Sequence, residues 1–419
     1  MQRNSLDKKL YVLKAASRLA TKQGSLKNLL KLPIKSRKTR IGEWSWVILP
    51  SWAQDLVPPG EVGFFVPRQQ LNEKWFEYDW WEGAYQMLTS QTERQHEKSK
   101  GPIHSYSFRL DNTMDKAFDY AWFNRIIMFL QRWWGFENDC SEGEVFGARA
   151  KPAIYLTHDV DAVSKTIAIR LKQTAFNLYN VEVRKASKFI FGSGDYWQFE
   201  TIRAIEEKNG HTSNWNFYGG PGGWSRKPKA LLMDPSYDVR SSRVVEQINE
   251  LVAAGHTIGL HPSFDAWQNS DKILSEKYRL EQVLSRDVKS VRQHWLKFSF
   301  SETWIAQSEC GLSHDFTLGF NDRVGFRNSA AVSFVDEVSG IYVTPMVLMD
   351  SHLYDYSKSD REGRCRKIDR ILDELVATSG EASIIWHQRV FHDDYGWREG
   401  YEYLIDGMKK RQITSKNVS

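Results

Sequence analysis

From Pro152 onward, the chain alternates short apolar runs with stretches of helical periodicity. This alternation predicts a parallel sheet covered by helices, because parallel strands need crossover connections and helices usually supply them. We therefore expect an α/β domain over residues 151–419, in the form of a barrel. The expected strands lie near 153–158, 213–218, 256–261, 290–295, 341–349 and 383–388, and the expected helices near 199–208, 241–254, 271–286, 361–378 and 397–411.

Two of the expected strands end in ionisable side chains. The apolar run Ala153 to Leu156 leads directly into Thr157-His158-Asp159-Val160-Asp161. A later run follows a turn at Gly255 and ends at His261, with Asp265 four residues further on. The carboxyl ends of the strands form the mouth of a parallel barrel, where catalytic groups lie. These carboxylates and imidazoles are therefore candidate metal ligands and acid–base groups of one site.

The length of the chain and its cysteines indicate the number of domains and the cellular compartment. A chain of 419 residues is long for one domain, so a main domain and a smaller one are expected. Its three cysteines lie far apart and lack zinc-ligand spacing, which is typical of a reducing compartment. No apolar run approaches the ~18 residues that a membrane span requires, and the N-terminus lacks the apolar core of a secretory signal. The expected location is the cytoplasm.

Residues 1–40 are a basic segment. They contain 12 lysines and arginines against a single acid, Asp7, whereas residues 41–419 contain 45 basic and 51 acidic side chains. Leucines and alanines recur mostly every three or four positions, which predicts a basic amphipathic arm. Such a helix could bind an anionic surface at the inner face of a membrane. It could equally be a solvated arm or pack on a neighbouring subunit.

Residues 41–150 form a tryptophan-rich accessory region without an evident catalytic cluster. Strand-like pieces at 44–49 and 62–66 precede expected helices at 80–94 and 114–134. The tryptophans could stack on sugars, but most tryptophans in proteins belong to the core, and we favour that structural role. They are Trp44, Trp46, Trp52, Trp75, Trp80, Trp81, Trp122, Trp133 and Trp134.

The motifs at the strand ends resemble those of the polysaccharide deacetylase family, also called NodB-homology proteins or carbohydrate esterase family 4. Thr157 to Asp161 is similar to the family's first motif, Thr-Phe-Asp-Asp, in the branch that reads Thr-His-Asp-Val-Asp. Gly255 to Gly259 and His261 match the second motif, Gly-His-x-Ile-Gly followed by His-(Ser/Thr)-x-x-His, in which Asp265 replaces the second histidine. The resemblance implies a distorted, incomplete seven-stranded (β/α) barrel behind an N-terminal accessory α+β region.

Two later strand ends extend the resemblance. Ser290 to Trp295 stands where the family has an Arg-Pro-Pro-like strand end, and Ser383 to His387 matches a strand that ends in Leu-His. The resemblance makes Asp159 the catalytic base, Arg292 the partner that keeps it ionised, and His387 the general acid. Histidine suits proton transfer because its unperturbed pKa is near ~6.5.

The resemblance also implies a divalent metal. Its expected ligands are Asp161, His261 and Asp265, an oxygen and nitrogen set that suits a divalent transition metal. Zinc is the expected metal, with manganese, iron or nickel as alternatives. Because Val160 takes the place of the family's second aspartate, the roles of Asp159 and Asp161 could be exchanged. His294 could bind the metal or the substrate, or only fill space. The expected substrate-binding side chains are His158, His294, Arg327, Asp234 and Tyr237.

The activity implied by the resemblance is metal-dependent removal of an N-acetyl or O-acetyl group from a sugar. The expected substrate is an N-acetylated sugar, nucleotide sugar or lipid-linked glycan used in cell-envelope polysaccharide biosynthesis. The alternative is a catalytically inactive glycan-binding or scaffold protein, which the replaced histidine and the tryptophan-rich region would fit. No nucleic acid is expected as a partner, because the excess positive charge is confined to residues 1–40.

Overall fold

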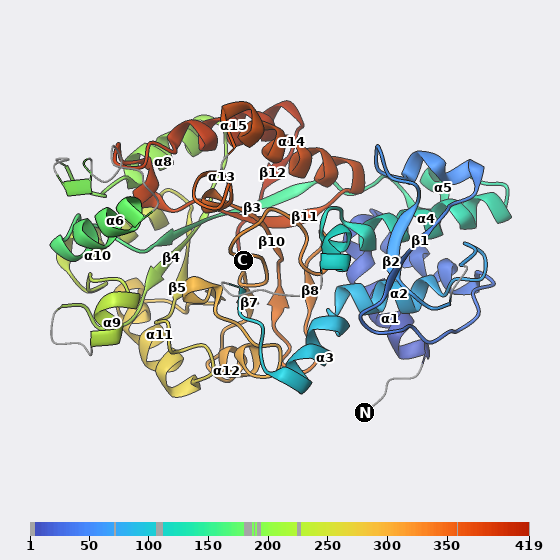
Figure 1. Ribbon diagram of the computed structural model, residues 1–419, viewed down its shortest axis with the longest axis horizontal. Coiled ribbons are helices and arrows are strands. Elements are labelled where there is room, and N and C mark those ends of the chain that lie inside the picture. The colour runs from blue at the N-terminus through green and yellow to red at the C-terminus, as the bar shows by residue number, and fades with distance from the viewer. Residues whose placement is uncertain are drawn as a thin grey trace.

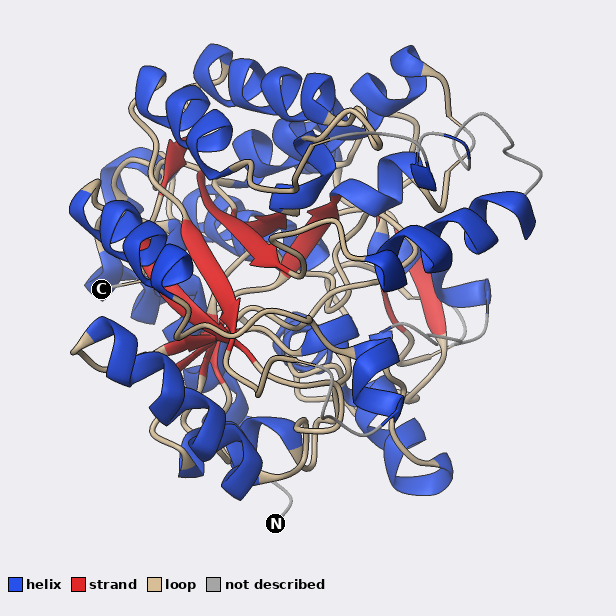
Figure 2. Cartoon of the chain, turned by 90° about the vertical axis from the view of Figure 1, so that its left-hand side faces the viewer, coloured by secondary structure: helices blue, strands red, loops and turns tan. Residues whose placement is uncertain are grey.

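A barrel of parallel strands and an accessory region beside it make up the molecule (Figure 1). Helices surround the strands of the barrel, as the view from its side shows (Figure 2). The computed structural model describes residues 5–418 except 71–72, 106–111, 180–186, 188, 191–193, 224–227 and 358.

The first strands of the barrel run parallel and in sequence order. β3 (Ala153–Val160) is buried along its whole length and pairs with β4 (Asn214–Tyr218), which pairs with β5 (Thr257–His261). β6 (Ser290–Val291) and β7 (His314–Asp315) follow and are only two residues long. A strand buried on both faces needs an unbroken apolar run, which is why β3 was recognisable in the sequence.

A bent strand closes the sheet on itself. β9 (Tyr342–Val343) pairs with β7, and β10 (Met346–Met349) pairs with β11 (Glu381–Ile385), which pairs with β3. Since only two residues separate β9 from β10, they count as one bent strand, and the ring then has seven strand positions. β8 (Phe334–Val335) and β12 (Thr414–Ser415) pair with β9 and β3 at its edges. The predicted α/β fold with a distorted, incomplete seven-stranded barrel is confirmed.

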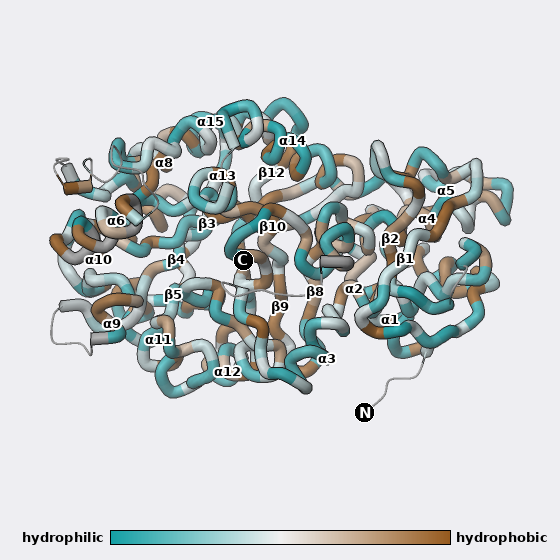
Figure 3. Tube along the Cα trace, viewed as in Figure 1, coloured by the Kyte–Doolittle hydropathy of each residue, from teal (hydrophilic) through white to brown (hydrophobic). Residues whose placement is uncertain are grey.

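Helices in the connections cover the barrel, and the outer ones carry hydrophilic stretches (Figure 3). Gly255 has φ +87° where the helix before β5 ends, a conformation that glycine adopts at little cost. The helices of this part are α6 (Ile167–Tyr179), α8 (Phe199–Lys208), α9 (Pro228–Met233), α10 (Ser242–Ala253), α11 (Ser270–Leu284), α12 (Thr303–Glu309), α13 (Asp350–Tyr354), α14 (Arg361–Thr378) and α15 (Arg398–Lys410).

Some elements differ from the prediction. The strand expected over 290–295 stops at Val291, because the chain then turns through a 3-10 segment, η6 (His294–Leu296), with left-handed backbone at Trp295. The helix expected over 80–94 is divided at Ser90, whose φ of +52° breaks the helical path. It forms α2 (Trp80–Leu88) and α3 (Gln91–Lys100).

The accessory region takes the basic N-terminal segment into its core. α1 (Ser5–Ala16) packs on α2 and buries Tyr11, Val12 and Leu13. The apolar positions of the predicted amphipathic arm are thus largely covered by the protein itself. The other elements are η2 (Gln23–Lys31), η3 (Ser51–Leu56), the antiparallel strands β1 (Trp44–Val47) and β2 (Phe64–Pro67), η5 (Asn112–Phe118), α4 (Trp122–Glu137) and α5 (Glu142–Phe146).

Buried ion pairs fasten the accessory region to the barrel. Arg125 on α4 lies 2.5 Å from the carboxylate of Glu374 on α14. Glu93 on α3 pairs with Arg327 at 2.8 Å. Trp80, Trp81 and Trp122 are buried in the apolar core of this region. None of the helices within the described ranges is long and apolar enough to cross a membrane.

Candidate active site

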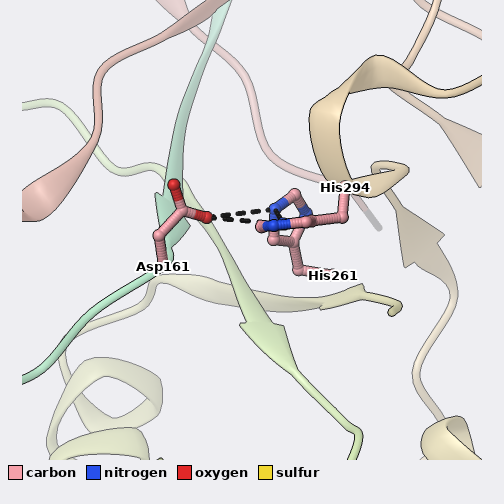
Figure 4. Close-up of side chains that lie close together, drawn as sticks. All are labelled: Asp161, His261 and His294. Carbon is pink, nitrogen blue, oxygen red and sulfur yellow. Dashed lines mark hydrogen bonds and ion pairs between the residues drawn. The ribbon is translucent and has the colours of Figure 1, made fainter. Parts of the chain in front are cut away.

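Three side chains converge at the mouth of the barrel (Figure 4). Asp161 follows β3, His261 ends β5 and His294 follows β6. One oxygen or nitrogen atom of each lies within 4.8 Å of the others. The three meet because the carboxyl ends of parallel strands share one end of a barrel.

Two backbone carbonyls determine which nitrogen of each imidazole carries a proton. His261 Nδ1 lies 2.8 Å from the carbonyl oxygen of Arg292, and His294 Nε2 lies 2.8 Å from that of Met233. A carbonyl oxygen can only accept, so these nitrogens donate. When both rings are neutral, His261 Nε2 and His294 Nδ1, which lie 2.7 Å apart, are therefore the nitrogens that carry the lone pairs. Two lone pairs at that distance need a proton or a cation between them.

The carboxylate of Asp161 adds a third electron donor. Its Oδ1 lies 3.3 Å from His261 Nε2 and 3.6 Å from His294 Nδ1. This oxygen is buried and accepts no hydrogen bond from the part of the chain that the structure describes. Burial, together with His261, also lowers the pKa of His294 to about 3, which keeps that ring neutral. Two imidazoles and one carboxylate are the donor set that divalent transition metals prefer, so the residues fit a metal.

Arg389 binds the other carboxylate oxygen of Asp161. Its guanidinium donates to Asp161 Oδ2, while Oδ1 faces the two histidines. Burial opposes ionisation of this carboxyl, but Arg389 and the neighbouring histidines hold its pKa well below the usual range. Arg389 was not among the predicted site residues. The available signal was its position two residues after the strand-terminal His387.

Asp159 points into the same mouth and is held as a carboxylate. Arg292 Nη1 lies 3.2 Å from its Oδ1, and the amide of Asn216 on β4 donates to the same oxygen at 2.8 Å. Burial would raise the pKa of Asp159, but Arg292 and the nearby histidines lower it. Arg292 itself is fully buried and also donates to Thr157 Oγ1 and the carbonyl of Phe316. Asn216 is a further unpredicted site residue.

His387 lies on the opposite side of Asp161 and is oriented by Asp350. Its Nδ1 donates to the Asp350 carboxylate at 3.0 Å, and its backbone N–H donates to the same group at 2.6 Å. Its Nε2 lies 3.5 Å from Asp161 Oδ2. Burial opposes the charged imidazolium, but Asp350 and Asp161 outweigh it and raise the pKa of His387. The ring is thus suited to hold a proton at neutral pH.

Asp265 lies outside this cluster, which corrects the predicted ligand set. Its exposed carboxylate accepts from Lys229 at 2.9 Å and lies 3.6 Å from Lys297. The chain leaves the barrel mouth directly after His261, because Glu276 binds the backbone N–H and hydroxyl of Ser263. His294 takes the third position that was expected for Asp265.

His158 and Arg327 are also placed differently from the prediction. Successive side chains of a strand point to opposite faces, so His158 lies behind β3 when Asp159 faces the mouth. The buried His158 ring bonds to the carbonyl of Trp386 and to Glu206. Arg327 is buried in its ion pair with Glu93, away from the cluster. Neither side chain is available to a substrate at the mouth.

Asp234 and Tyr237 shape the wall of the site. Asp234 accepts the backbone N–H of Phe264 at 2.7 Å, and the Tyr237 hydroxyl accepts that of Tyr218 at 2.7 Å. Burial raises the pKa of Tyr237 well above its usual value, and the negative charges of Asp161 and Asp159 add to the effect. These contacts position the loop that carries Met233, whose carbonyl binds His294.

No family model and no curated protein matches this chain. Solved structures with a similar arrangement include a protein of Mycobacterium smegmatis described as a polysaccharide deacetylase, at 15% identity and a TM-score of 0.37, covering 64% of this chain and 97% of that one. A chitin deacetylase from Colletotrichum lindemuthianum has 12% identity, a TM-score of 0.35 and coverage of 64% and 86%. A carbohydrate esterase family 4 pseudoenzyme from Bacillus anthracis has 10% identity, a TM-score of 0.34 and coverage of 64% and 64%.

Proposed function

We propose that this protein is a divalent-metal-dependent hydrolase that removes an acetyl group from a sugar. One observation carries the proposal: three electron donors, Asp161, His261 and His294, converge between an ionised carboxylate and a histidine that favours its protonated form. Metal-assisted hydrolysis needs this combination of a ligand set, a base and an acid.

Two side chains of the protein, Asp159 and His387, carry out the proton transfers of the proposed reaction. A bound cation would supply Lewis-acid chemistry, polarising the acetyl carbonyl and acidifying water. Asp159, kept ionised by Arg292 and Asn216, accepts the proton that the attacking water loses. His387, kept protonated and oriented by Asp350, donates a proton to the departing nitrogen or oxygen. The products are acetate and a deacetylated sugar.

Zinc is the metal we favour, because two imidazoles and one carboxylate form a frequent zinc set in hydrolases. Manganese, iron and nickel accept the same donors. We propose N-acetylated sugars as substrates, either free, carried by a nucleotide or linked to a lipid. We propose cell-envelope polysaccharide biosynthesis in the cytoplasm as the setting in which the protein meets such a substrate.

The test is release of acetate. The metal-loaded full-length protein is incubated with N-acetylated nucleotide sugars and with chitooligosaccharides, and acetate is measured. His387→Gln and Asp159→Asn are each expected to lower kcat by about 100-fold or more, since general acid and base catalysis contribute about that much. Absence of acetate from every substrate, despite a full complement of metal and measurable glycan binding, would favour an inactive glycan-binding protein.

A further inference from the structure

Beside His294, three loops form an aromatic and cationic surface. The Met233 carbonyl at the end of α9 accepts from the His294 ring at 2.8 Å and from the Trp295 indole at 3.3 Å. The Trp295 ring lies 6.2 Å from the His294 ring and 6.4 Å from the Phe264 ring, between centroids. Since His294 belongs to the candidate metal cluster, this surface adjoins the metal centre directly.

Trp295 is held outward by its backbone. It has φ +58° and the next residue, Leu296, has φ +49°. Side chains other than glycine rarely adopt this left-handed conformation, and such strain is concentrated at functional sites. Trp295 is 37% exposed, whereas Leu296 is buried. Part of a large aromatic side chain is therefore exposed next to a candidate catalytic centre.

Two lysines lie over the neighbouring rings of Phe264 and Trp267. Lys297 Nζ lies 4.2 Å from the ring centre of Phe264 and 5.2 Å from that of Trp267. Lys229 Nζ lies 5.4 Å from the Phe264 centre, on the exposed side. Both ammonium groups share the single carboxylate of Asp265.

Among the described residues, the charged groups that act most strongly on Lys297 are Asp265, Lys229 and Lys272. Asp265 is the common partner of Lys229 and Lys297, and Lys272 adds a further positive charge in its surroundings. The surface formed by Trp295, Lys229 and Lys297, which we call the platform, therefore combines an exposed aromatic side chain with two ammonium groups that share one carboxylate.

We propose that the platform is a subsite for a sugar residue that bears an anionic group, next to the residue that is deacetylated. The proposal deepens the function proposed above and depends on it for the identity of the neighbouring site. Pyranose rings present apolar C–H faces that stack on indoles, and the lysines would pair with a carboxylate or a phosphate. The substrate class is thus an acidic glycan or a phosphorylated sugar rather than a neutral polymer.

The test measures how tightly glycan probes bind to the full-length protein. The protein carries His387→Gln so that it does not deacetylate the probes. Calorimetry compares unsulfated chondroitin tetrasaccharide, which carries carboxylates, with N-acetylglucosamine 1-phosphate and neutral chitotetraose. We expect either or both anionic probes to bind about 10-fold tighter than chitotetraose at low salt, and the difference to shrink in about 0.5 M NaCl. A preference for only one anionic probe identifies the group as carboxylate or phosphate.

Variants that remove a positive or a negative charge from the platform distinguish anion binding from a structural role. Lys229→Met and Lys297→Met should each weaken the anionic probes by about 3-fold or more and leave chitotetraose unchanged, whereas Asp265→Asn should strengthen the anionic probes. Trp295→Ala, which keeps a non-glycine residue in the left-handed turn, should weaken all three probes. Lys409→Met on α15 changes the net charge equally and should have no effect.

Equal binding of all probes, or lysine variants without effect, would overturn the subsite. The two proposals fail separately. Acetate release by the unsubstituted protein from neutral and acidic substrates alike, with no change in the Lys229 and Lys297 variants, would overturn the subsite alone. Retained anionic binding without any acetate release would overturn the proposed function and leave the subsite.

Discussion

His261 Nε2 and His294 Nδ1 lie 2.7 Å apart, and each ring donates through its other nitrogen to a backbone carbonyl. The two rings come from neighbouring strands rather than from one local motif. Because the carbonyls determine which nitrogen of each ring donates to the backbone, the other two nitrogens face each other. The pair is therefore prepared to share a cation together with Asp161.

Metal content should depend on His294 and not on Asp265. Removing His294 deletes one of three donors, so His294→Ala should reduce metal affinity by at least about 10-fold to 100-fold, the range known for loss of even indirect metal partners. Asp265→Asn should keep full metal content, since Asp265 pairs with lysines. Elemental analysis after dialysis against a chelator measures both. Metal loss in the Asp265 variant alone would contradict the assignment.

Arg292 should support both stability and catalysis. Replacing this fully buried guanidinium leaves Asp159 as an unpaired buried charge, so Arg292→Met should cost about 3–5 kcal/mol of unfolding free energy. The pKa of Asp159 should rise, and kcat should fall. The double variant Arg292→Met with Asp159→Leu should recover much of the stability and none of the activity. Urea denaturation and acetate release test this, and an unchanged stability of the single variant would oppose it.

The alkaline limit of activity should be set by His387. A general acid must be protonated, and Asp350 helps to raise the pKa of His387 above its ordinary value. Activity should therefore fall as pH rises through that pKa. Asp350→Asn removes the raising charge, so the alkaline limb of kcat/KM should move to lower pH. If the alkaline limb of the Asp350→Asn variant stays at the same pH while its metal content is intact, a group other than His387 determines that limb.

Glu276 should make stability depend on pH. Burial raises its pKa from 4.5 to about 7 in the folded protein. Between these values the folded state keeps a proton that the unfolded chain releases, so stability decreases as pH rises through this window. The shift corresponds to about 3 kcal/mol. Relative to the unsubstituted protein, Glu276→Gln should gain about that much unfolding free energy between pH 4 and pH 8, and parallel pH profiles would refute this.

Arg327 should act on stability rather than on substrate binding. Arg327→Met leaves Glu93 buried without its partner and should cost about 3–5 kcal/mol. The KM of the remaining folded enzyme should not change. Glu93→Gln is the matched variant on the other side of the pair and should weaken the same contact. A raised KM of the Arg327→Met variant with unchanged stability would instead indicate that Arg327 contributes to substrate binding.

Much of the site could be predicted from the strand ends, since Asp159, Asp161, His261 and His387 lie at the ends of apolar runs. Arg292 was found by its match to a motif, because only Val291 precedes it as an apolar residue in its short strand. Other members had weaker signals. Asn216 lies inside an expected strand, and two asparagines at alternating positions were the available signal. Arg389 and Asp350 lie in turns after strands, where polar residues are common for local reasons.

The sequence by itself determined the barrel, because the periods of apolar residues in strands and helices are local properties of the chain. It also determined which strand ends carry charge. Only the tertiary structure decided between Asp265 and His294 as the third donor. That choice depends on the direction of the chain after β5 and β6, which the contacts of Ser263 with Glu276 and of His294 with Met233 determine. Such contacts join residues that are far apart in the sequence, so they cannot be predicted from a local sequence pattern.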